Sequence, residues 1–240
     1  MRTKLLVGMG VAAIACAAVA APKINFASVL AAPDRPDADK VRDADRKPAE
    51  VMAFAGVKAG DKIAELAPGG GYFTRLLSGA VGPKGVVYAI ARQASPALQA
   101  IADAHPNVKI AVSPPGTIGA PEPVDIVWTT LNYHDFKNVK VGDSDGAAFY
   151  NQAAFKALKP GGTYFIVDHE AGKGVGATVT STLHRIEGAT VRREVESAGF
   201  KFDGESPLLR HAADDHSQRV IETGIRGKTD QFVYRFRKPK

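Results

Sequence analysis

Short apolar runs alternate along the chain with stretches in which apolar residues recur at helical spacing. The helical stretches predict helices at 72–79, 95–105 and 146–158, and the apolar runs predict buried strands at 63–67, 85–91, 108–112, 124–130 and 163–168. Strands buried on both faces have continuous apolar sequences, and their alternation with helices is typical of parallel sheets. We therefore predict an α/β fold with a doubly wound, mainly parallel sheet.

The last third of the chain adds a helix at 191–198 and strands at 200–205 and 231–237, which bring the predicted sheet to seven strands. The final strand follows a long polar loop, 206–230, so we expect it to pair antiparallel at or near the sheet edge. Alternation places every second side chain on one face. We expect the following aromatic residues in the core: Trp128, Phe232, Tyr234 and Phe236.

Residues 34–47 form a segment of dense, alternating charge that precedes a helix from Pro48 to about Gly56. Its spacing favours a solvated helical arm held by ion pairs between residues three and four apart. In the alternative interpretation, Arg35, Arg42 or Arg46 reaches over an active site.

The N-terminus has the pattern of a secretory signal peptide. Arg2 and Lys4 precede an uncharged stretch, 5–21, and residues 18–20 form a small-x-small cleavage site. We predict a signal peptide at 1–20, a linker at 21–33 and a single domain at 34–240. The mature protein would be exported to the periplasm without stable membrane insertion. Acylation of Cys16 as a lipoprotein is the alternative.

The composition narrows the function classes. A hydrophobic content of 45% and a charged content of 23% exclude a disordered chain and a polytopic membrane protein. The formal net charge of +6 comes from the predicted signal peptide and from the last fifteen residues, which hold six basic side chains and one acidic one. Because nucleic-acid binders usually spread positive charge over a face, we expect a small-molecule partner and no nucleic acid. A single cysteine excludes a disulfide scaffold.

A tight glycine turn links the strand at 63–67 to the helix that follows. Glycines there let the backbone turn sharply and let a ligand approach closely. No Gly-Lys-Ser/Thr follows, which argues against a phosphate-binding P-loop. An NAD site would need an acidic residue at the end of the second strand, where Ala91 and Arg92 stand.

The turn, with Glu65 before it, resembles the first motif of the class I S-adenosylmethionine-dependent methyltransferases. Residues 124–135 are similar to that family's fourth strand and following loop, and 158–168 to its Leu-Lys-Pro-Gly-Gly entry into the fifth strand. The signal peptide, 132–135, 183–186 and 226–232 are similar to a bacterial group of exported "predicted methyltransferases". The resemblance implies a seven-stranded, Rossmann-like methyltransferase fold with a charged N-terminal helical arm.

The resemblance also implies that S-adenosylmethionine binds at the turn, with its ribose beside the end of the second strand and its adenine near 113–114. Two positions depart from the family pattern: Ala67 replaces the usual first glycine, and Ala91 replaces the acidic residue that grips the ribose. Each lost charge-assisted hydrogen bond costs about 1.5–3 kcal/mol, or about tenfold to a hundredfold in affinity. The implied cofactor-binding residues are Glu65, Ala67, Gly69, Gly70, Gly71, Tyr72, Phe73, Ala91, Arg92 and Asn132.

His134 is the first candidate for a catalytic group, because it follows a strand that ends at the predicted crevice. A histidine near its ordinary pKa can take a proton from a methyl acceptor. We expect Asp135 to orient its imidazole. In the structural alternative, His134 only hydrogen-bonds the backbone of its loop.

Further polar residues fall on segments long enough to cover the crevice. We assign weaker substrate roles to Tyr133, His169, His184, Arg185 and His216. Residues 168–170 could join His134 and His184 in a polar pocket or a metal site, but no His-x-x-x-His spacing supports one, and we predict no metal.

These observations lead to two functional hypotheses. The first is an exported methyltransferase that uses S-adenosylmethionine on a small molecule. The second is a binding protein, or an enzyme of another reaction, that kept the fold and lost the cofactor chemistry. Ala91 favours the second and the intact glycine turn the first.

Overall fold

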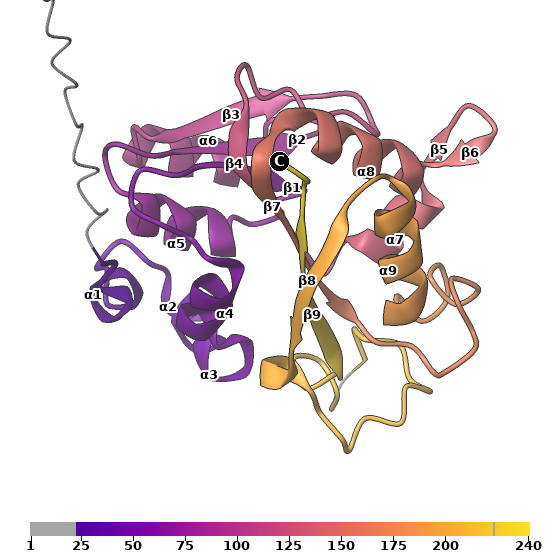
Figure 1. The fold of residues 1–240 in the computed structure, drawn as a ribbon. Helices are drawn as coiled ribbons and strands as arrows, with labels where there is room; N and C mark the ends of the chain where they lie inside the picture. Colours follow the sequence, from indigo (N-terminus) through magenta and orange to yellow (C-terminus); the bar gives the residue numbers. More distant parts are fainter. Residues whose placement is uncertain (1–22, 223) are drawn as a thin grey trace, which may run out of the picture.

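The computed structural model describes residues 23–222 and 224–240 (Figure 1). The predicted signal peptide and Cys16 lie outside the described residues. None of the helices in the described part is long and apolar enough to span a bilayer.

A seven-stranded sheet forms the centre of the molecule, with strand order β3-β2-β1-β4-β7-β9-β8. The strands from β3 through β7 pair parallel, and β9 pairs antiparallel with both β7 and β8. The predicted α/β class and mainly parallel sheet are confirmed. The bounds are β1 (Lys62–Leu66), β2 (Val86–Ala91), β3 (Val108–Val112), β4 (Val124–Thr130), β7 (Leu158–His169), β8 (Lys201–Ser206) and β9 (Gln231–Arg237).

The final strand pairs antiparallel as expected, and it lies one place in from the edge, which β8 occupies. The predicted aromatic core residues are buried: Trp128, Phe232, Tyr234 and Phe236. A separate hairpin consists of β5 (Lys140–Val141) and β6 (Ser144–Asp145).

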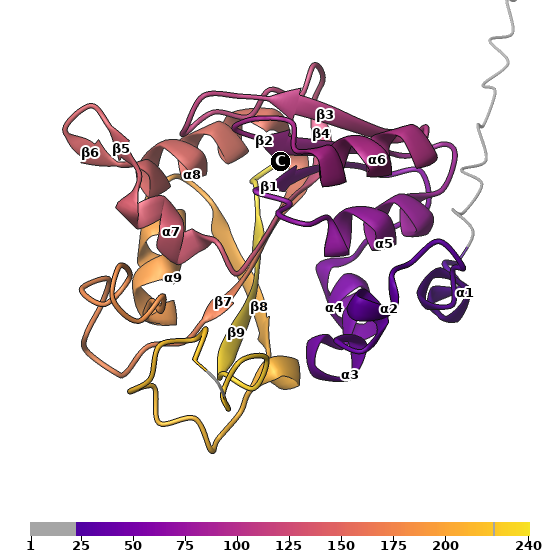
Figure 2. The ribbon, with the colours of Figure 1, turned by 180° about the vertical axis from the view of Figure 1, so that it is seen from behind.

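Helices cover both faces of the sheet (Figures 1 and 2). One apolar cluster joins α1 (Phe26–Leu30), α4 (Pro48–Ala55), α5 (Tyr72–Val81) and α6 (Pro96–Ala104) to one face. A second cluster joins α7 (Tyr133–Asn138), α8 (Gly146–Ala157) and α9 (Gly188–Ser197) to the other. The predicted polar loop after β8 begins with the short 3-10 helix η1 (Pro207–Leu209).

The segment predicted as a linker contains α1, which packs against α5: Val29 is buried and lies against Gly79. The described part of the predicted linker, 23–33, therefore contains a helix that packs on the domain. Asn25 caps this helix by accepting a hydrogen bond from the backbone of Ser28.

The charged segment folds into two short helices, α2 (Asp37–Lys40) and α3 (Asp43–Arg46), that lie beside α4 and α5 (Figure 1). Arg35 is buried and forms two hydrogen bonds to the Asp43 carboxylate, at 2.6 and 2.8 Å. The Tyr72 hydroxyl of α5 donates to the same carboxylate at 2.6 Å. This Arg35–Asp43–Tyr72 network fixes the arm to the start of α5. Most other side chains of 34–47 are exposed, and Asp37–Lys40 and Asp39–Arg42 are ion pairs between residues three apart, as expected for a solvated helical arm.

We expect Arg35→Ala to lower the free energy of unfolding by about 2–3 kcal/mol, because the Asp43 carboxylate would lose the guanidinium that donates two hydrogen bonds to it. Urea denaturation measures the change. Lys40→Ala is the matched control, since its ion pair with Asp37 lies at the surface and should contribute less than about 1 kcal/mol. Equal losses in the two variants would contradict the role given to the network.

Candidate functional site

The candidate site lies where the carboxyl ends of β1 and β4 meet. The strand order reverses between these neighbours, and the chain leaves β1 toward α5 on one face and β4 toward α7 on the other. Ligands of open α/β sheets bind in the crevice at such a switch point. The glycine turn, 67–71, follows β1, and residues 131–135 follow β4.

The glycine turn has the backbone conformation expected for close approach of a ligand. Gly69 and Gly71 have φ of 57° and 79°, and a Cβ at Gly69 or Gly70 would meet nothing within 4 Å. A Cβ at Gly71 would instead collide with Ile101 of α6. Ala67 has φ of 52°, a left-handed conformation that favours glycine, in agreement with the glycine usual at this place in the resembled family.

A polar cavity of about 240 Å³ opens in front of this turn and extends beneath the arm. It brings together most of the predicted cofactor-binding residues. Its lining residues are Asp39, Arg42, Arg46, Glu65, Ala67, Pro68, Gly69, Gly70, Tyr72, Phe73, Thr130, Leu131 and Asn132.

Arginines of the arm supply the positive charge of this cavity. Arg46 lies over the Tyr72 ring, with its guanidinium carbon 4.5 Å from the ring centroid, and Arg42 lies 5.1 Å from it. Arg42 pairs with Asp39, whereas Arg46 pairs with no carboxylate in the part of the chain that the structure describes. Burial, with the nearby charge of Arg42, lowers the pKa of Arg46 to about 10. Arg46 therefore remains charged at neutral pH and is available to an anionic ligand group.

Glu65 is the buried acidic group of the same cavity, 3% exposed at the end of β1. Burial raises the pKa of its carboxyl from 4.5 to about 7, although a 2.6 Å hydrogen bond from Thr74 Oγ1 works in the opposite direction. A cationic ligand group beside Glu65 would favour its ionised form.

A second, mainly apolar cavity of about 170 Å³ adjoins the first, with which it shares Ala67 and Asn132. Ala91 and Arg92, expected beside the ribose, both line it. Its full lining is Leu66, Ala67, Ile90, Ala91, Arg92, Ser113, Asn132, Asp135, Phe136, Val139 and Tyr150. Between the two cavities, the Asn132 side-chain amide donates to the carbonyls of Ala67 and Thr130, which ties the end of β4 to the glycine turn.

His134 is oriented by Asp168 at the end of the neighbouring strand β7, and not mainly by Asp135. Asp168 accepts from His134 Nδ1 at 2.8 Å and from the His134 backbone N–H at 2.7 Å. Burial opposes the charge of both side chains, but their mutual attraction raises the pKa of His134 and lowers that of Asp168. Because Asp168 accepts the Nδ1 proton, Nε2 is the ring nitrogen of His134 that can accept a proton.

Asp135 lies on the other side of the His134 ring. Its Oδ1 atom is 3.4 Å from His134 Nε2 and also 3.4 Å from His184 Nδ1. The rings of His134 and His184 are perpendicular, with centroids 5.3 Å apart. The structure thus brings together three predicted site residues from two distant parts of the chain.

Three residues assigned weaker substrate roles have structural partners instead. The Tyr133 hydroxyl is buried between Glu194 and Asn151. Arg185 is fully buried, and it donates to Asp214 and to the carbonyls of Glu170 and Gln218. The contacts of Arg185 link the segment after β8 to the end of β7.

His216 belongs to the same structural network, since its Nε2 atom lies 3.2 Å from Asp230. His169 is 7% exposed, and its Nδ1 atom lies 2.7 Å from Thr229 Oγ1. Burial lowers the pKa of His169 to about 4, so it is a neutral side chain of the interior at neutral pH. These partners give Tyr133, Arg185 and His216 structural roles, and their contact with a substrate stays a prediction.

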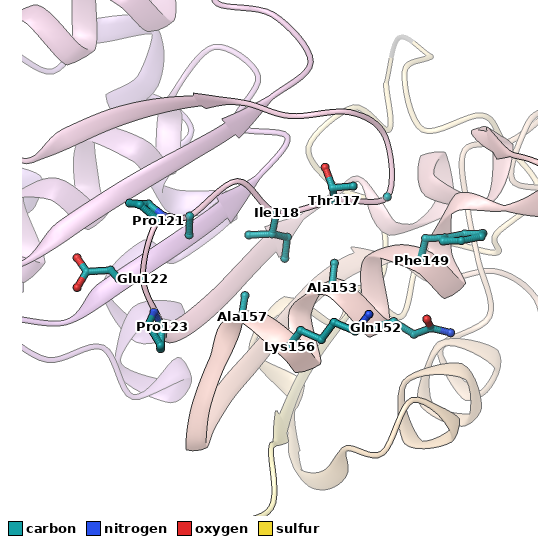
Figure 3. A pocket seen from close by; sticks show the side chains of 12 residues that line it. Thr117, Ile118, Pro121, Glu122, Pro123, Phe149, Gln152, Ala153, Lys156 and Ala157 are labelled. Carbon is teal, nitrogen blue, oxygen red and sulfur yellow. The ribbon is translucent and has the colours of Figure 1, made fainter.

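A larger cavity of about 590 Å³ lies between the loop before β4 and helix α8 (Figure 3). It borders the amino end of β4 and contains none of the predicted site residues. Its charged lining residues are Glu122 and Lys156, and Glu122 already accepts a hydrogen bond from Tyr88 and pairs with Lys62. The clustering of titratable groups places the candidate site at the opposite strand ends.

Comparison with solved structures identifies the fold. A SAM-dependent methyltransferase from Aquifex aeolicus superimposes with a TM-score of 0.61 at 19% identity, over 90% of this chain and 100% of that one. The N-methyltransferase NodS from Bradyrhizobium japonicum gives 0.56 at 13% identity, over 81% and 96%. The chain has the Rossmann-like methyltransferase fold.

The same fold also occurs in a neighbour of another reaction class. The [4+2]-cyclase SpnF has a TM-score of 0.60 at 14% identity, over 82% of this chain and 81% of that one. No protein-family model and no curated protein matches the sequence. At these identities the methyltransferase fold is established by shape, and the reaction has to be argued from the site.

We expect Glu65→Gln to change how stability depends on pH. Between its ordinary pKa of 4.5 and about 7, native Glu65 binds a proton that the unfolded chain has released, so its contribution to stability falls as pH rises through this window. Glutamine keeps the acceptor for Thr74 and removes the titration. The melting temperature of the variant relative to the natural protein should therefore be higher at pH 8 than at pH 5, by about 2–4 °C per kcal/mol.

Differential scanning calorimetry at the two pH values measures this difference. Glu50→Gln, at an exposed position of α4, is the control and should show no such change. An identical pH dependence in Glu65→Gln and the natural protein would exclude a titrating, buried Glu65.

Proposed function

We propose that this protein is an exported methyltransferase that uses S-adenosylmethionine to methylate a small molecule. The observation that carries the proposal is the pair of adjoining cavities at the glycine turn, one charged and one apolar, on a methyltransferase fold. S-adenosylmethionine has the matching division into a zwitterionic amino-acid end and an adenosine end.

The charged cavity fits the amino-acid end. Arg46, without a carboxylate partner among the described residues, would bind the carboxylate, and Glu65 would accept from the ammonium group. The glycine turn presents open backbone at Gly69 and Gly70, where a side chain would occupy ligand space. The first turn of α5 would add the favourable end of its dipole.

The apolar cavity fits the adenosine end less completely. Leu66, Ile90 and Phe136 provide apolar contact for a purine ring, but Ala91 provides no acceptor for the ribose hydroxyls. We infer binding that is weaker by about tenfold to a hundredfold than in a site with a carboxylate at this position.

S-adenosylmethionine supplies an electrophilic methyl group when it is bound. Toward the acceptor, the chain offers His134, whose Nε2 atom can take a proton while Asp168 holds the ring through Nδ1. The Asp168 carboxylate also stabilises the imidazolium that would form, because it is buried and hydrogen-bonded. Asp168 is thus a positioning residue for His134.

The remaining parts of the proposal rest on the sequence. The pattern of residues 1–21 supports export to the periplasm, and the location of the basic residues near the chain ends supports a small-molecule partner over nucleic acid. Because S-adenosylmethionine is made in the cytoplasm, an exported enzyme would need a supply of the cofactor in its own compartment.

One observation favours a second candidate function. The missing ribose partner at Ala91 is compatible with a binding protein or a non-methylating enzyme on this fold, and one structural neighbour, SpnF, is a [4+2]-cyclase. The two candidates differ in whether a methyl group is released from the cofactor.

We expect S-adenosylhomocysteine to bind the purified protein with one site per chain in a calorimetric titration. Arg46→Ala should weaken binding by about tenfold or more, since it removes a charge-assisted contact to the carboxylate. Arg192→Ala, which alters a surface pair with Glu196 on α9, is the matched control. Absence of binding at millimolar ligand, or equal effects of both substitutions, would refute the proposed cofactor site.

For turnover, we expect S-adenosylhomocysteine to form when the protein is incubated with S-adenosylmethionine and a small-molecule extract. His134→Ala should reduce the rate by about 10²–10⁴-fold, because the proton acceptor is lost. His211→Ala controls for removal of a histidine elsewhere. Cofactor binding without any product would favour the second candidate function.

A further inference from the structure

We infer that His134, Asp135 and His184 form a binding site for a divalent transition-metal ion of the Zn²⁺ type. The three side chains each offer one ligand atom, and these atoms lie within 4.8 Å of one another. Two residues come from the start of α7, and His184 comes from the segment before α9, about fifty positions later.

The spacing of the ligand atoms is close to that of a tetrahedral zinc site. Zinc binds nitrogen and oxygen ligands at about 2.0–2.1 Å, which places neighbouring ligand atoms about 3.3–3.5 Å apart in a tetrahedron. Asp135 Oδ1 already lies 3.4 Å from both His134 Nε2 and His184 Nδ1. The two histidine nitrogens lie within 4.8 Å of each other, so the third edge would shorten by at most about 1.5 Å on binding.

The hydrogen bond between His134 Nδ1 and Asp168 orients the imidazole so that Nε2 can bind a metal ion. Asp168 accepts the Nδ1 proton at 2.8 Å, so the lone pair of Nε2 points toward Asp135 and His184. In zinc sites, a carboxylate commonly accepts the proton of the ring nitrogen that does not bind the metal, and so fixes the orientation of the histidine. Asp168 itself is fully buried and is fixed by the backbone N–H groups of His134 and His169.

The donor set also selects the class of ion. Two imidazoles and one carboxylate suit zinc and related transition metals, whereas Mg²⁺ and Ca²⁺ prefer oxygen ligands throughout. Three protein ligands leave a coordination position open, as in catalytic zinc sites. Asp135 also lines the apolar cavity, so the open position would lie beside the proposed cofactor site.

Arg219 opposes metal binding in the state that the structure describes. Its guanidinium lies 3.0 Å from His184 Nε2, where it can only donate, and it thereby places the proton of a neutral His184 on Nδ1. An ion at Nδ1 requires that proton to leave this nitrogen and Arg219 to withdraw. Side-chain exposures of 26% for His184 and 49% for Asp135 leave a route for the ion from solvent.

The metal site does not depend on the proposed methyl transfer, because its geometry involves no cofactor. If both hold, the ion would bind an oxygen atom of the acceptor and lower its pKa, and the proton of that oxygen would pass to solvent water. His134 would then act as a metal ligand and would no longer take the proton itself.

Calorimetric titration of the purified protein with ZnCl₂ alone tests the inference. We expect one Zn²⁺ per chain, no comparable binding of Mg²⁺, and the visible absorption of tetrahedral Co²⁺ when Co²⁺ is used. His184→Ala and Asp135→Asn should each weaken Zn²⁺ binding by more than about tenfold, whereas His211→Ala should leave it unchanged. No saturable site, or equal binding by His184→Ala and the natural protein, would overturn the inference.

Two further variants separate this site from adventitious binding. Arg219→Ala should bind Zn²⁺ at least as tightly as the natural protein, and weaker binding would contradict Nδ1 as the ligand atom of His184. Asp168→Asn should weaken binding by about 10–100-fold. Unchanged Zn²⁺ affinity in Asp168→Asn with an unchanged melting temperature would contradict the role of Asp168 in orienting the His134 ring.

The cofactor titration is run separately on metal-free protein. Failure of S-adenosylhomocysteine to bind would refute the proposed function and leave the Zn²⁺ result standing. Failure of Zn²⁺ to bind would overturn the metal site alone.

Discussion

The buried carboxylate of Asp168 is the group on which the geometry of the candidate site depends. A fully buried negative charge must be compensated by several hydrogen bonds, because its desolvation is otherwise prohibitive. Asp168 obtains them from the start of α7 and from its own strand end: the backbone N–H groups of His134 and His169 and the His134 ring. These bonds set where α7 begins and which nitrogen of His134 faces the crevice.

The other half of the site depends on a second buried charge, in the arm. Arg35 and Asp43 hold α2 and α3 against Tyr72, and this contact carries Arg42 and Arg46 over the glycine turn. The polar cavity is therefore lined on one side by the ends of β1 and β4 and on the other by the arm, which precedes the sheet in sequence. The positively charged residues that line it, Arg42 and Arg46, both belong to the arm.

Local sequence patterns predicted the architecture well. Apolar runs located the strands, the glycine turn identified the crevice, and His134 was placed at its edge because it follows a strand. Contacts between residues on neighbouring strands could not be predicted from local sequence. Asp168 is predicted at the end of a strand, but its pairing with His134 arises because β4 and β7 are parallel neighbours. The burial of Tyr133 and Arg185 likewise depends on distant partners, Glu194 and Asp214. Nothing in the alternating charges of 34–47 reveals that the arm packs on Tyr72.

The placement of β9 has a consequence for the order in which the sheet can form. Among the described residues, β8 pairs with no strand other than β9, which comes last in sequence. Until residues 231–237 are available, β8 has no strand partner, and the outer edge of β7 remains open to pairing with other chains. The sheet is therefore completed only after synthesis of β9, and any cellular process that acts on the nascent chain before then encounters a sheet with an open edge.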